Sequence, residues 1–513
     1  MRLRASNELV RAGREFARDP HDMLKQLFTS QPIDRVRPDE EGPKLRRVLG
    51  WPALIAIGLG TMLGGIFTTI GVGAQVAGPG VIIGFLISGI VCIFVALCYA
   101  EFASMVPVAG SAYTYAYATL GELIAWVIGW DLILEYGISA APVASSWSGY
   151  VQDLLGSVGI KLPAWAQVAN LAATTAPMHL GSWHFTMLRS VDLAASSVDV
   201  TAAFGVLFIS VLLAIGIKES AGTNAFFVIL QVIAFLVFIF GCFAFVSPAH
   251  LHPLAPRGWP SIVTSASLVF FAYIGFDTVT VASEESTNPR RDVPIGIIGS
   301  LVIGGILYMI IAYITVGIVP WQHIASNSAM SQAARMAGSA PIFVAFVTIG
   351  AIAGNISVML TSLLGQTRIF YVMARDRLLP EAVSRVHPRF RTPARMTMIT
   401  GIVVAIMAAI IPLEKLLELV NIGTLSAFAI VCLGVLVLRF TQPEANRPFR
   451  APAGPLMAVL GLAGCLYLIF KGLPEATLIR FIVWFSIGII IYAFYGYRHS
   501  LLRTEVLARN GDK

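Results

Sequence analysis

Apolar runs recur along the whole chain of 513 residues, and short polar segments separate them. Many of these runs hold about twenty residues, the length that an α-helix needs to cross the hydrocarbon core of a bilayer. Hydropathy predicts about twelve spans. Their centres lie near Gly60, Ile90, Ile138, Phe208, Ile233, Ala272, Tyr308, Ile356, Val404, Val431, Leu460 and Ile489. The pattern therefore predicts an all-α integral membrane protein that is surrounded by the lipid bilayer.

The composition agrees with this fold class. Hydrophobic residues make up 57% of the chain and charged residues 12%, whereas soluble domains carry roughly 25% charged residues. The net charge is +7, but the basic residues do not form a patch that would bind nucleic acid. Arginines gather instead in alternate connecting segments, within 290–291, 375–395, 439–450 and 498–509. By the positive-inside rule these segments and both termini are cytoplasmic, so we expect a multi-pass protein of the plasma membrane.

The first span contains an unusual stretch, residues 58–67, in which four of ten residues are glycine. Within a bilayer, a broken helix persists only where protein or a water-filled cavity surrounds the break. A break near Gly64 would start a new half-helix at Ile66, whose free N–H groups and positive dipole end would bind a carboxylate. The carbonyls from Gly60 to Met62 would suit an ammonium group. The alternative is that these glycines only allow helices to pack closely.

The sixth span repeats this feature, because residues 270–277 place Gly275 and an acidic residue at mid-depth. Two interrupted antiparallel spans, five apart, are typical of inverted-repeat transporters that bind substrate between the repeats. We therefore predict a cytoplasmic tail (1–49), a transporter core (50–440), two additional transmembrane helices (453–497) and a cytoplasmic C-terminal tail (498–513). Within the core, the two five-helix repeats cover about 50–246 and 260–440.

Four polar side chains inside the spans are candidates for coupling or gating: Glu135, Gln231, Asp277 and Arg368. Glu135 shares a helix face with Asp131, and a carboxylate inside a span by default marks a functional pathway; the alternative is a hydrogen bond to a neighbouring helix. Gln231 lies among apolar residues, where a glutamine more often joins helices than binds substrate. Arg368 either belongs to an inner gate or extends its guanidinium group to the membrane interface.

Other classes of function find little support in the sequence. The five cysteines lie in apolar segments without metal-ligand spacing, so we assign them no chemistry. No HExxH motif is present, and the pair His250 and His252 falls in a predicted outer loop. We therefore expect neither an enzyme nor a resident metal or cofactor. The short termini leave little room for the output domain of a sensor.

Several blocks of the sequence resemble one known family. They include Tyr99-Ala100-Glu101 and residues 108–115, 129–136, 147–150, 218–220, 270–277, 365–376, 419–425 and 447–450. Together they extend over nearly all of the membrane portion, and they resemble the cationic amino acid transporter family of the amino acid, polyamine and organocation superfamily. The resemblance implies twelve spans in five-plus-five inverted repeats, with broken first and sixth helices. It also implies secondary transport of amino acids by alternating access.

The same resemblance implies a set of site residues. In that family, backbone N–H groups at the first break hold the α-carboxylate, and they map here to Gly64, Gly65 and Ile66. Carbonyls at both breaks hold the α-amine, and they map to Leu63 in the first span and to Phe271, Ala272 and Ile274 in the sixth. Gly275, at the second break itself, completes the candidate site.

Two departures from the family pattern matter. The family usually has one more small residue between the glycines that correspond to Gly64 and Gly65, so the register of the carboxylate site is open by one position. Proton-coupled bacterial relatives have a lysine where this chain has Gln231, which cannot titrate. Proton symport by the usual route is therefore in doubt. Facilitated uniport, exchange, or coupling through Glu135 or Asp277 all stay open.

We therefore expect secondary transport of L-amino acids with a broad neutral or cationic range, in which a neutral or broad preference is slightly favoured. Asp277 is the carboxylate nearest the second break and would be the partner of a cationic side chain. A polyamine or other organocation permease is the main alternative. The sequence leaves open whether a small accessory membrane subunit accompanies the chain.

Overall fold

The protein is described here by a computed structural model that covers residues 48–105, 112–170, 173–180, 183–192, 196–216, 221–383, 385–388 and 392–501. Most of the predicted N-terminal tail and the end of the C-terminal tail lie outside these residues. So do residues 106–111 and 218–220.

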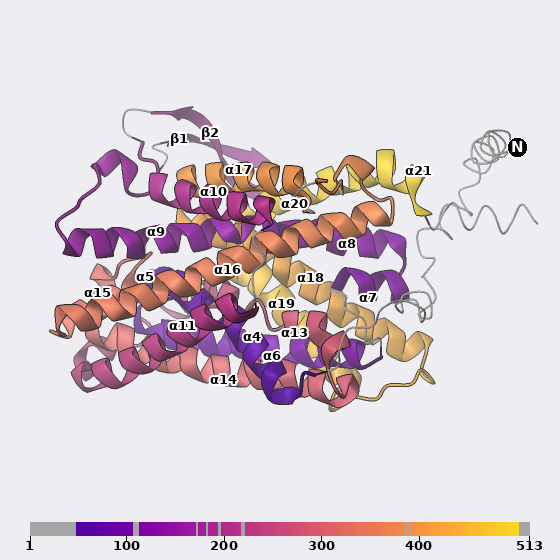
Figure 1. The fold of residues 1–513 in the computed structure, drawn as a ribbon, viewed down its shortest axis with the longest axis horizontal. Helices are drawn as coiled ribbons and strands as arrows, with labels where there is room; N and C mark the ends of the chain where they lie inside the picture. Colours follow the sequence, from indigo (N-terminus) through magenta and orange to yellow (C-terminus); the bar gives the residue numbers. More distant parts are fainter. Residues whose placement is uncertain are drawn as a thin grey trace, which may run out of the picture.

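Long helices that run along a common axis make up most of the molecule (Figure 1). The part of the chain that the structure describes has nine apolar helical stretches of at least 18 residues and three shorter apolar helices, Trp51–Met62, Val200–Ile215 and Ala394–Ile410. One long stretch, Gly65–Met105, contains two crossings, because it turns back at Gly78–Gly80. The first of these continues the short helix Trp51–Met62. Together the segments account for the predicted crossings. The prediction of a multi-span helical membrane protein is confirmed.

The helices follow the predicted spans closely. The first five spans comprise α4 (Trp51–Met62) with α5 (Gly65–Ala77), α6 (Val81–Met105), α8 (Glu122–Leu132) with α9 (Ala140–Ser157), α10 (Val200–Ile215) and α11 (Ala221–Cys242). The next five comprise α12 (Trp259–Val269) with α13 (Thr278–Val281), α14 (Pro289–Ile318), α16 (Pro341–Arg375), α17 (Ala394–Ile410) and α18 (Leu413–Thr441). The last two comprise α19 (Pro455–Tyr467) and α20 (Glu475–Ile491).

Shorter elements lie at the two ends of the molecule. They are α7 (Ala112–Thr119), α15 (Ala329–Met336), α21 (Tyr497–His499) and an antiparallel pair of strands, β1 (Ala173–Leu180) and β2 (Trp183–Val191). Figure 1 shows α15 at one end of the bundle and the strands above α10 and α17 along the flank of the same half; we call this the hairpin end. The elements α7 and α21 lie toward the other end, which we call the α7 end. The hairpin, which was not predicted, lies in the long connection between the third and fourth spans.

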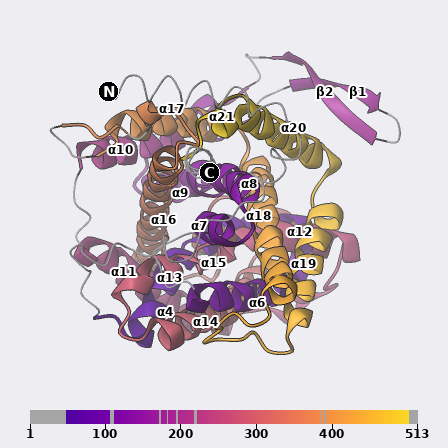
Figure 2. The same ribbon diagram turned by 90° about the vertical axis from the view of Figure 1, so that its right-hand side faces the viewer.

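The spans pack in two main groups. In the first group, α14 contacts both α6 and α4, and α12 contacts α5 and α6. In the second group, α10 packs against α17, and α9 packs against α16 and α10. Figure 2 shows α4, α6 and α14 together on one side, with α10 and α17 together on the opposite side. The two broken spans thus belong to the same group.

A buried carboxylate ties the first group to α18. Glu101, near the end of α6, is 1% exposed. It accepts a hydrogen bond from Arg439 of α18 at 3.1 Å and pairs with Arg447 at 3.3 Å. The backbone N–H of Ala451 also donates to Glu101, at 2.9 Å. The charge and lone pairs of this carboxylate are therefore compensated by groups from the following connection as well as from α18.

The ion cluster around Glu101 generates a stability prediction. Glu101→Gln leaves two guanidinium groups without their counter-charge, and breaking a buried pair in this way costs roughly 3–5 kcal/mol. The free energy of unfolding in detergent micelles, from denaturant titration, measures the loss.

Arg335→Gln is the matched control, because Arg335 is 43% exposed in its pair with Asp153 and such a pair contributes roughly 0–1 kcal/mol. Equal losses in the two variants would contradict the structural role of the Glu101 cluster.

Candidate functional site

The first span is interrupted between Met62, the last residue of α4, and Gly65, the first residue of α5. Leu63 and Gly64 keep right-handed helical dihedral angles, with φ/ψ of −58°/−27° and −64°/−27°. The break is therefore an interruption of the hydrogen-bond ladder and not an extended segment. The Phe67 N–H donates to the Gly64 carbonyl at 3.2 Å, so the N–H groups at the very start of α5 are the ones without an acceptor in their own helix.

The sixth span is interrupted more widely. After α12, residues Phe270–Tyr273 form a 3₁₀ turn, Ile274 is extended, and Gly275 has φ of +114°. That dihedral angle strongly favours glycine, because a Cβ would be strained there. The helix resumes only at Thr278. Broken first and sixth helices were both predicted, and both are present.

The two breaks lie against each other. A Cβ added to Gly65 would lie 2.6 Å from the Cα of Ala272, so glycine is required for this approach. On the opposite side of the contact, the Thr61 hydroxyl donates to the Gly275 carbonyl at 2.9 Å and lies 3.0 Å from the Thr278 hydroxyl. Glycine at 65 and 275 thus allows two broken helices to meet backbone to backbone.

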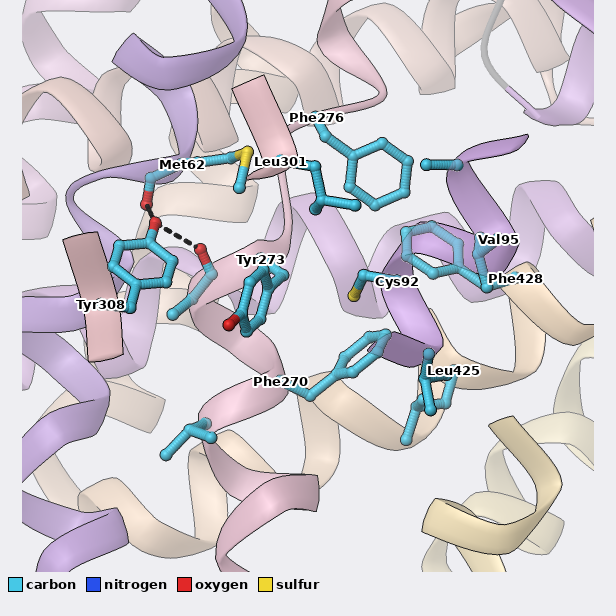
Figure 3. Close-up of a cluster of buried hydrophobic side chains, with 14 of the residues drawn as sticks. Met62, Cys92, Val95, Phe270, Tyr273, Phe276, Leu301, Tyr308, Leu425 and Phe428 are labelled. Carbon is cyan, nitrogen blue, oxygen red and sulfur yellow. Dashed lines mark hydrogen bonds between the residues drawn. The ribbon is translucent and has the colours of Figure 1, made fainter. Parts of the chain in front are cut away.

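A tyrosine from a third helix joins the two breaks. The Tyr308 hydroxyl, on α14, lies 2.7 Å from the Met62 carbonyl and 2.8 Å from the Ala272 carbonyl (Figure 3). Tyr308 is fully buried. Tyr308 was not among the predicted site residues; the only signal for it in the sequence is a tyrosine at the centre of an apolar span.

A cavity opens beside the breaks, with about 50 Å³ accessible to the centres of water molecules. This is room for a few waters, since one needs roughly 10–15 Å³. Its lining residues are Thr61, Met62, Gly65, Glu135, Tyr136, Ser139, Phe271, Ile274, Gly275, Thr278, Val358, Thr361 and Ser362. Gly65, Phe271, Ile274, Gly275 and Glu135 were expected at the site. The other candidates do not line this cavity: Leu63, Gly64, Ile66, Ala272, Gln231, Asp277 and Arg368.

The third span brings two polar side chains to the cavity through a π-helical turn, Ile133–Ile138, between α8 and α9. Such turns often occur at functional sites. The Tyr136 hydroxyl donates to a carboxylate oxygen of Asp277 at 3.0 Å, which links the third and sixth spans. The Glu135 carboxylate is 1% exposed and has no hydrogen-bond partner among the described residues. An unpartnered carboxylate at membrane depth is a strong candidate for proton or cation binding.

Gln231 of α11 is fully buried. It faces Gly354 of α16, where an added Cβ would lie 2.9 Å from the Gln231 Cδ and 3.1 Å from the Phe67 ring. A Cβ on Gly64 would lie 3.0 Å from the Gly354 carbonyl. Gly354 of α16 therefore lies against both Gln231 and the first broken span. Within the described part of the chain its amide makes no hydrogen bond.

Arg368 lies near the end of α16 and is exposed. Its side chain is therefore outside the cavity that Glu135 and the two breaks surround. The exposure agrees with a guanidinium group that reaches the membrane interface.

The segment before α15 covers the hairpin end of the first span. The Gln75 amide donates to the Ile324 carbonyl at 2.8 Å. The Ser146 hydroxyl of α9 lies 3.1 Å from the Phe67 carbonyl and 3.4 Å from the Asn327 carbonyl. These contacts fix α5 between α9 and the segment before α15. These contacts could not be predicted from local sequence patterns, because each pairs residues that are far apart in the chain.

Comparison with known proteins identifies the family. A model of an amino acid permease family matches residues 49–496. The chain belongs to this amino acid permease family. It is 41% identical over 483 residues to the branched-chain amino acid permease BcaP of Bacillus subtilis, which covers 94% of this chain and 100% of that protein.

Two further relatives widen the comparison. The methylthioribose transporter of Bacillus subtilis is 38% identical over 481 residues, 93% of this chain and 100% of that protein. The vacuolar cationic amino acid transporter 4 of Arabidopsis thaliana is 36% identical over 435 residues, 82% of this chain and 68% of that protein. The permease is thus a multi-pass membrane transporter and not an enzyme, and amino acids are its class of substrate. This confirms the family to which the sequence blocks pointed.

The contact between the breaks generates a mutational prediction. Gly65→Ala places a methyl group against the Ala272 backbone, which cannot move aside as a flexible side chain would. We expect uptake of labelled leucine into proteoliposomes to fall by about tenfold or more, which corresponds to ~1.4 kcal/mol of lost interaction. The variant should still elute as a single species from size-exclusion chromatography in detergent.

Gly156→Ala is the matched control, because no atom lies within 4 Å of a Cβ added there. It should transport at the wild-type rate. Unimpaired uptake by Gly65→Ala would refute the functional importance of the contact between the breaks.

Proposed function

We propose that this permease carries L-amino acids across the plasma membrane by alternating access, with the substrate backbone bound between the two breaks. The α-carboxylate binds the N–H groups at the start of α5, which Gly64, Gly65 and Ile66 supply. The ammonium group binds carbonyls of Leu63 and of the segment after α12, at Phe271, Ala272 and Ile274. The observation that carries the proposal is the meeting of these two breaks at the wall of one cavity.

The electrostatics of the two breaks support this orientation of the substrate. The start of a helix presents N–H groups and the positive end of its dipole, and the end of a helix presents carbonyls and the negative end. Here α4 ends at Met62 and α5 starts at Gly65, so both kinds of end lie within a few residues. A zwitterion carries the complementary pair of charges at a similar spacing.

The cavity wall favours a neutral aliphatic side chain. Met62, Phe271, Ile274 and Val358 supply apolar surface. Some of the relatives are named as branched-chain amino acid permeases. Glu135 is the carboxylate on the cavity wall, so it would be the partner of a cationic side chain in a broader range of substrates. A polyamine or other organocation would need several such carboxylates and is the second candidate.

Energy coupling rests on the polar groups inside the spans. Gln231 cannot titrate, so this permease either works as a uniporter or exchanger or takes its proton on Glu135 or Asp277. The Tyr136–Asp277 hydrogen bond joins the third and sixth spans, and Tyr136 lines the cavity, so this bond would break if the two spans move apart for release. We place the α7 end and both termini in the cytoplasm, as the distribution of arginine indicates.

One experiment tests the proposed function. The full-length permease in proteoliposomes is given labelled leucine, alanine, arginine or spermidine, each with and without an inward proton gradient. We expect leucine and alanine to enter faster than arginine, and spermidine to be excluded. Accumulation above equilibrium only with the gradient would establish proton coupling and make Glu135 and Asp277 the residues to mutate next. Entry of spermidine without amino acids would overturn the proposal.

Gln231 generates a separate prediction. A lysine in its place would be buried beside Gly354 and would bring an ionisable ammonium group to this position. Gln231→Lys should therefore make leucine uptake depend more strongly on pH than uptake by the wild type, which has no ionisable group there. Gln231→Met, of similar size and no charge, is the control and should keep the wild-type profile. Equal pH profiles for Gln231→Lys and the wild type would count against a coupling position at residue 231.

A further inference from the structure

The Tyr308 hydroxyl is shared between two acceptors. It lies 2.7 Å from the Met62 carbonyl and 2.8 Å from the Ala272 carbonyl (Figure 3). A hydroxyl has one proton to donate, so at any moment it can satisfy only one of these two carbonyls. The second carbonyl lacks that donor for as long as the first one has it.

One of the two carbonyls, that of Ala272, belongs to the proposed ammonium site, and the other, that of Met62, directly precedes Leu63 of that site. Met62 ends the first half-helix and lines the cavity. Ala272 lies in the 3₁₀ turn of the second break and touches Gly65. Because Gly64 and Gly65 are adjacent, the register of the site at the first break is open by one residue. In the shifted register the Met62 carbonyl would bind the ammonium group in place of the Leu63 carbonyl. Tyr308 therefore donates to the kind of acceptor that a substrate ammonium group would occupy.

Packing holds the Tyr308 ring in place without using its hydroxyl. The ring lies 5.3 Å from the Tyr273 ring in an edge-to-face arrangement and 5.8 Å from the Phe85 ring. Tyr308 is on α14, which contacts both α4 and α6. A third helix thus positions the hydroxyl at the breaks, and the contacts that hold it are made by protein groups alone.

We infer, on the basis of the proposed function, that Tyr308 is a positioning residue. In the empty carrier its hydroxyl takes the place of the substrate ammonium group. When an amino acid is bound, its three N–H donors satisfy the break carbonyls. When the site is empty, the Tyr308 hydroxyl donates to one carbonyl or the other and keeps the two broken helices together. Net uptake requires the empty carrier to change its orientation, whereas exchange requires only the loaded carrier to do so. Tyr308 therefore serves net uptake more than exchange.

Tyr308→Phe tests the inference, because it removes the hydroxyl and keeps the ring. The full-length variant is reconstituted, and entry of labelled leucine is measured into empty vesicles and into vesicles that hold unlabelled leucine. We expect net uptake to fall by about tenfold, the rate effect of one hydrogen bond, while exchange stays within about twofold of the wild type. Equal losses in both assays, or no loss in either, would overturn the inference.

Tyr273→Phe is the matched control. Its hydroxyl also donates to a backbone carbonyl at 2.7 Å, but that carbonyl belongs to Phe85 in the uninterrupted helix α6. This variant should keep the wild-type ratio of net uptake to exchange. A reduced ratio in both variants would show that the effect comes from packing in this region, which would contradict the specific role of Tyr308.

A second measurement does not depend on transport. Without its bridging hydroxyl the empty variant has two unsatisfied carbonyls, so saturating leucine should raise the melting temperature of Tyr308→Phe more than that of the wild type. Purification in the presence of leucine keeps a weakened variant available for both assays. A smaller rise than in the wild type would refute the inference.

The outcomes separate this inference from the proposed function. A wild type that moves none of the amino acids would refute the proposed function, and the role of Tyr308 with it. A wild type that exchanges leucine but takes up none into empty vesicles would refute the role of Tyr308 alone.

Discussion

The structure depends on the need to pair backbone polar groups in a medium without water. Where α12 ends, its last carbonyls have no partners within the helix. Side chains from other helices contact this end: the Asn421 amide donates to the carbonyls of Ser267 and Leu268 at 2.7 and 2.9 Å. The Ser88 hydroxyl adds a second donor, at 2.6 Å, to the Ala266 carbonyl, which also accepts from the Phe270 N–H. Span six can therefore break at mid-depth because α6 and α18 satisfy the end of its first half.

In this arrangement one part of the sixth span is held by neighbouring helices and the next part lines the cavity. The first half of the sixth span is anchored from several directions, since the Ser267 hydroxyl also donates to the Leu468 carbonyl in the eleventh span at 2.9 Å. The segment that follows, Ile274 and Gly275, leaves the helical conformation and lines the cavity. Under the proposed function, backbone atoms at the breaks recognise the substrate. The side chains of the cavity would then be free to set the range of substrates.

Much of the fold could be predicted because its signals are local. Runs of apolar residues mark the spans, and the glycines near Gly64 and Gly275 mark the breaks. The partners of the broken helices were not predictable, because they come from distant positions whose side chains have ordinary local roles. Ser88 and Asn421 look like residues that fill space in apolar spans, and Tyr308 looks like a packing aromatic. Their importance follows from which carbonyls they reach, and a single sequence does not encode those distances in any local pattern.

The π-helical turn at Ile133–Ile138 has a consequence for the evolution of this site. A π turn contains one residue more than the α-helical turn it replaces, and each residue of an α-helix rotates the chain by about 100°. Losing one residue there would leave the composition of the third span almost unchanged. It would, however, rotate α8 relative to α9 about the helix axis by that angle. Glu135 and Tyr136 could not both keep their present directions. For this part of the permease, the length of the chain constrains variation as strongly as the identity of any residue.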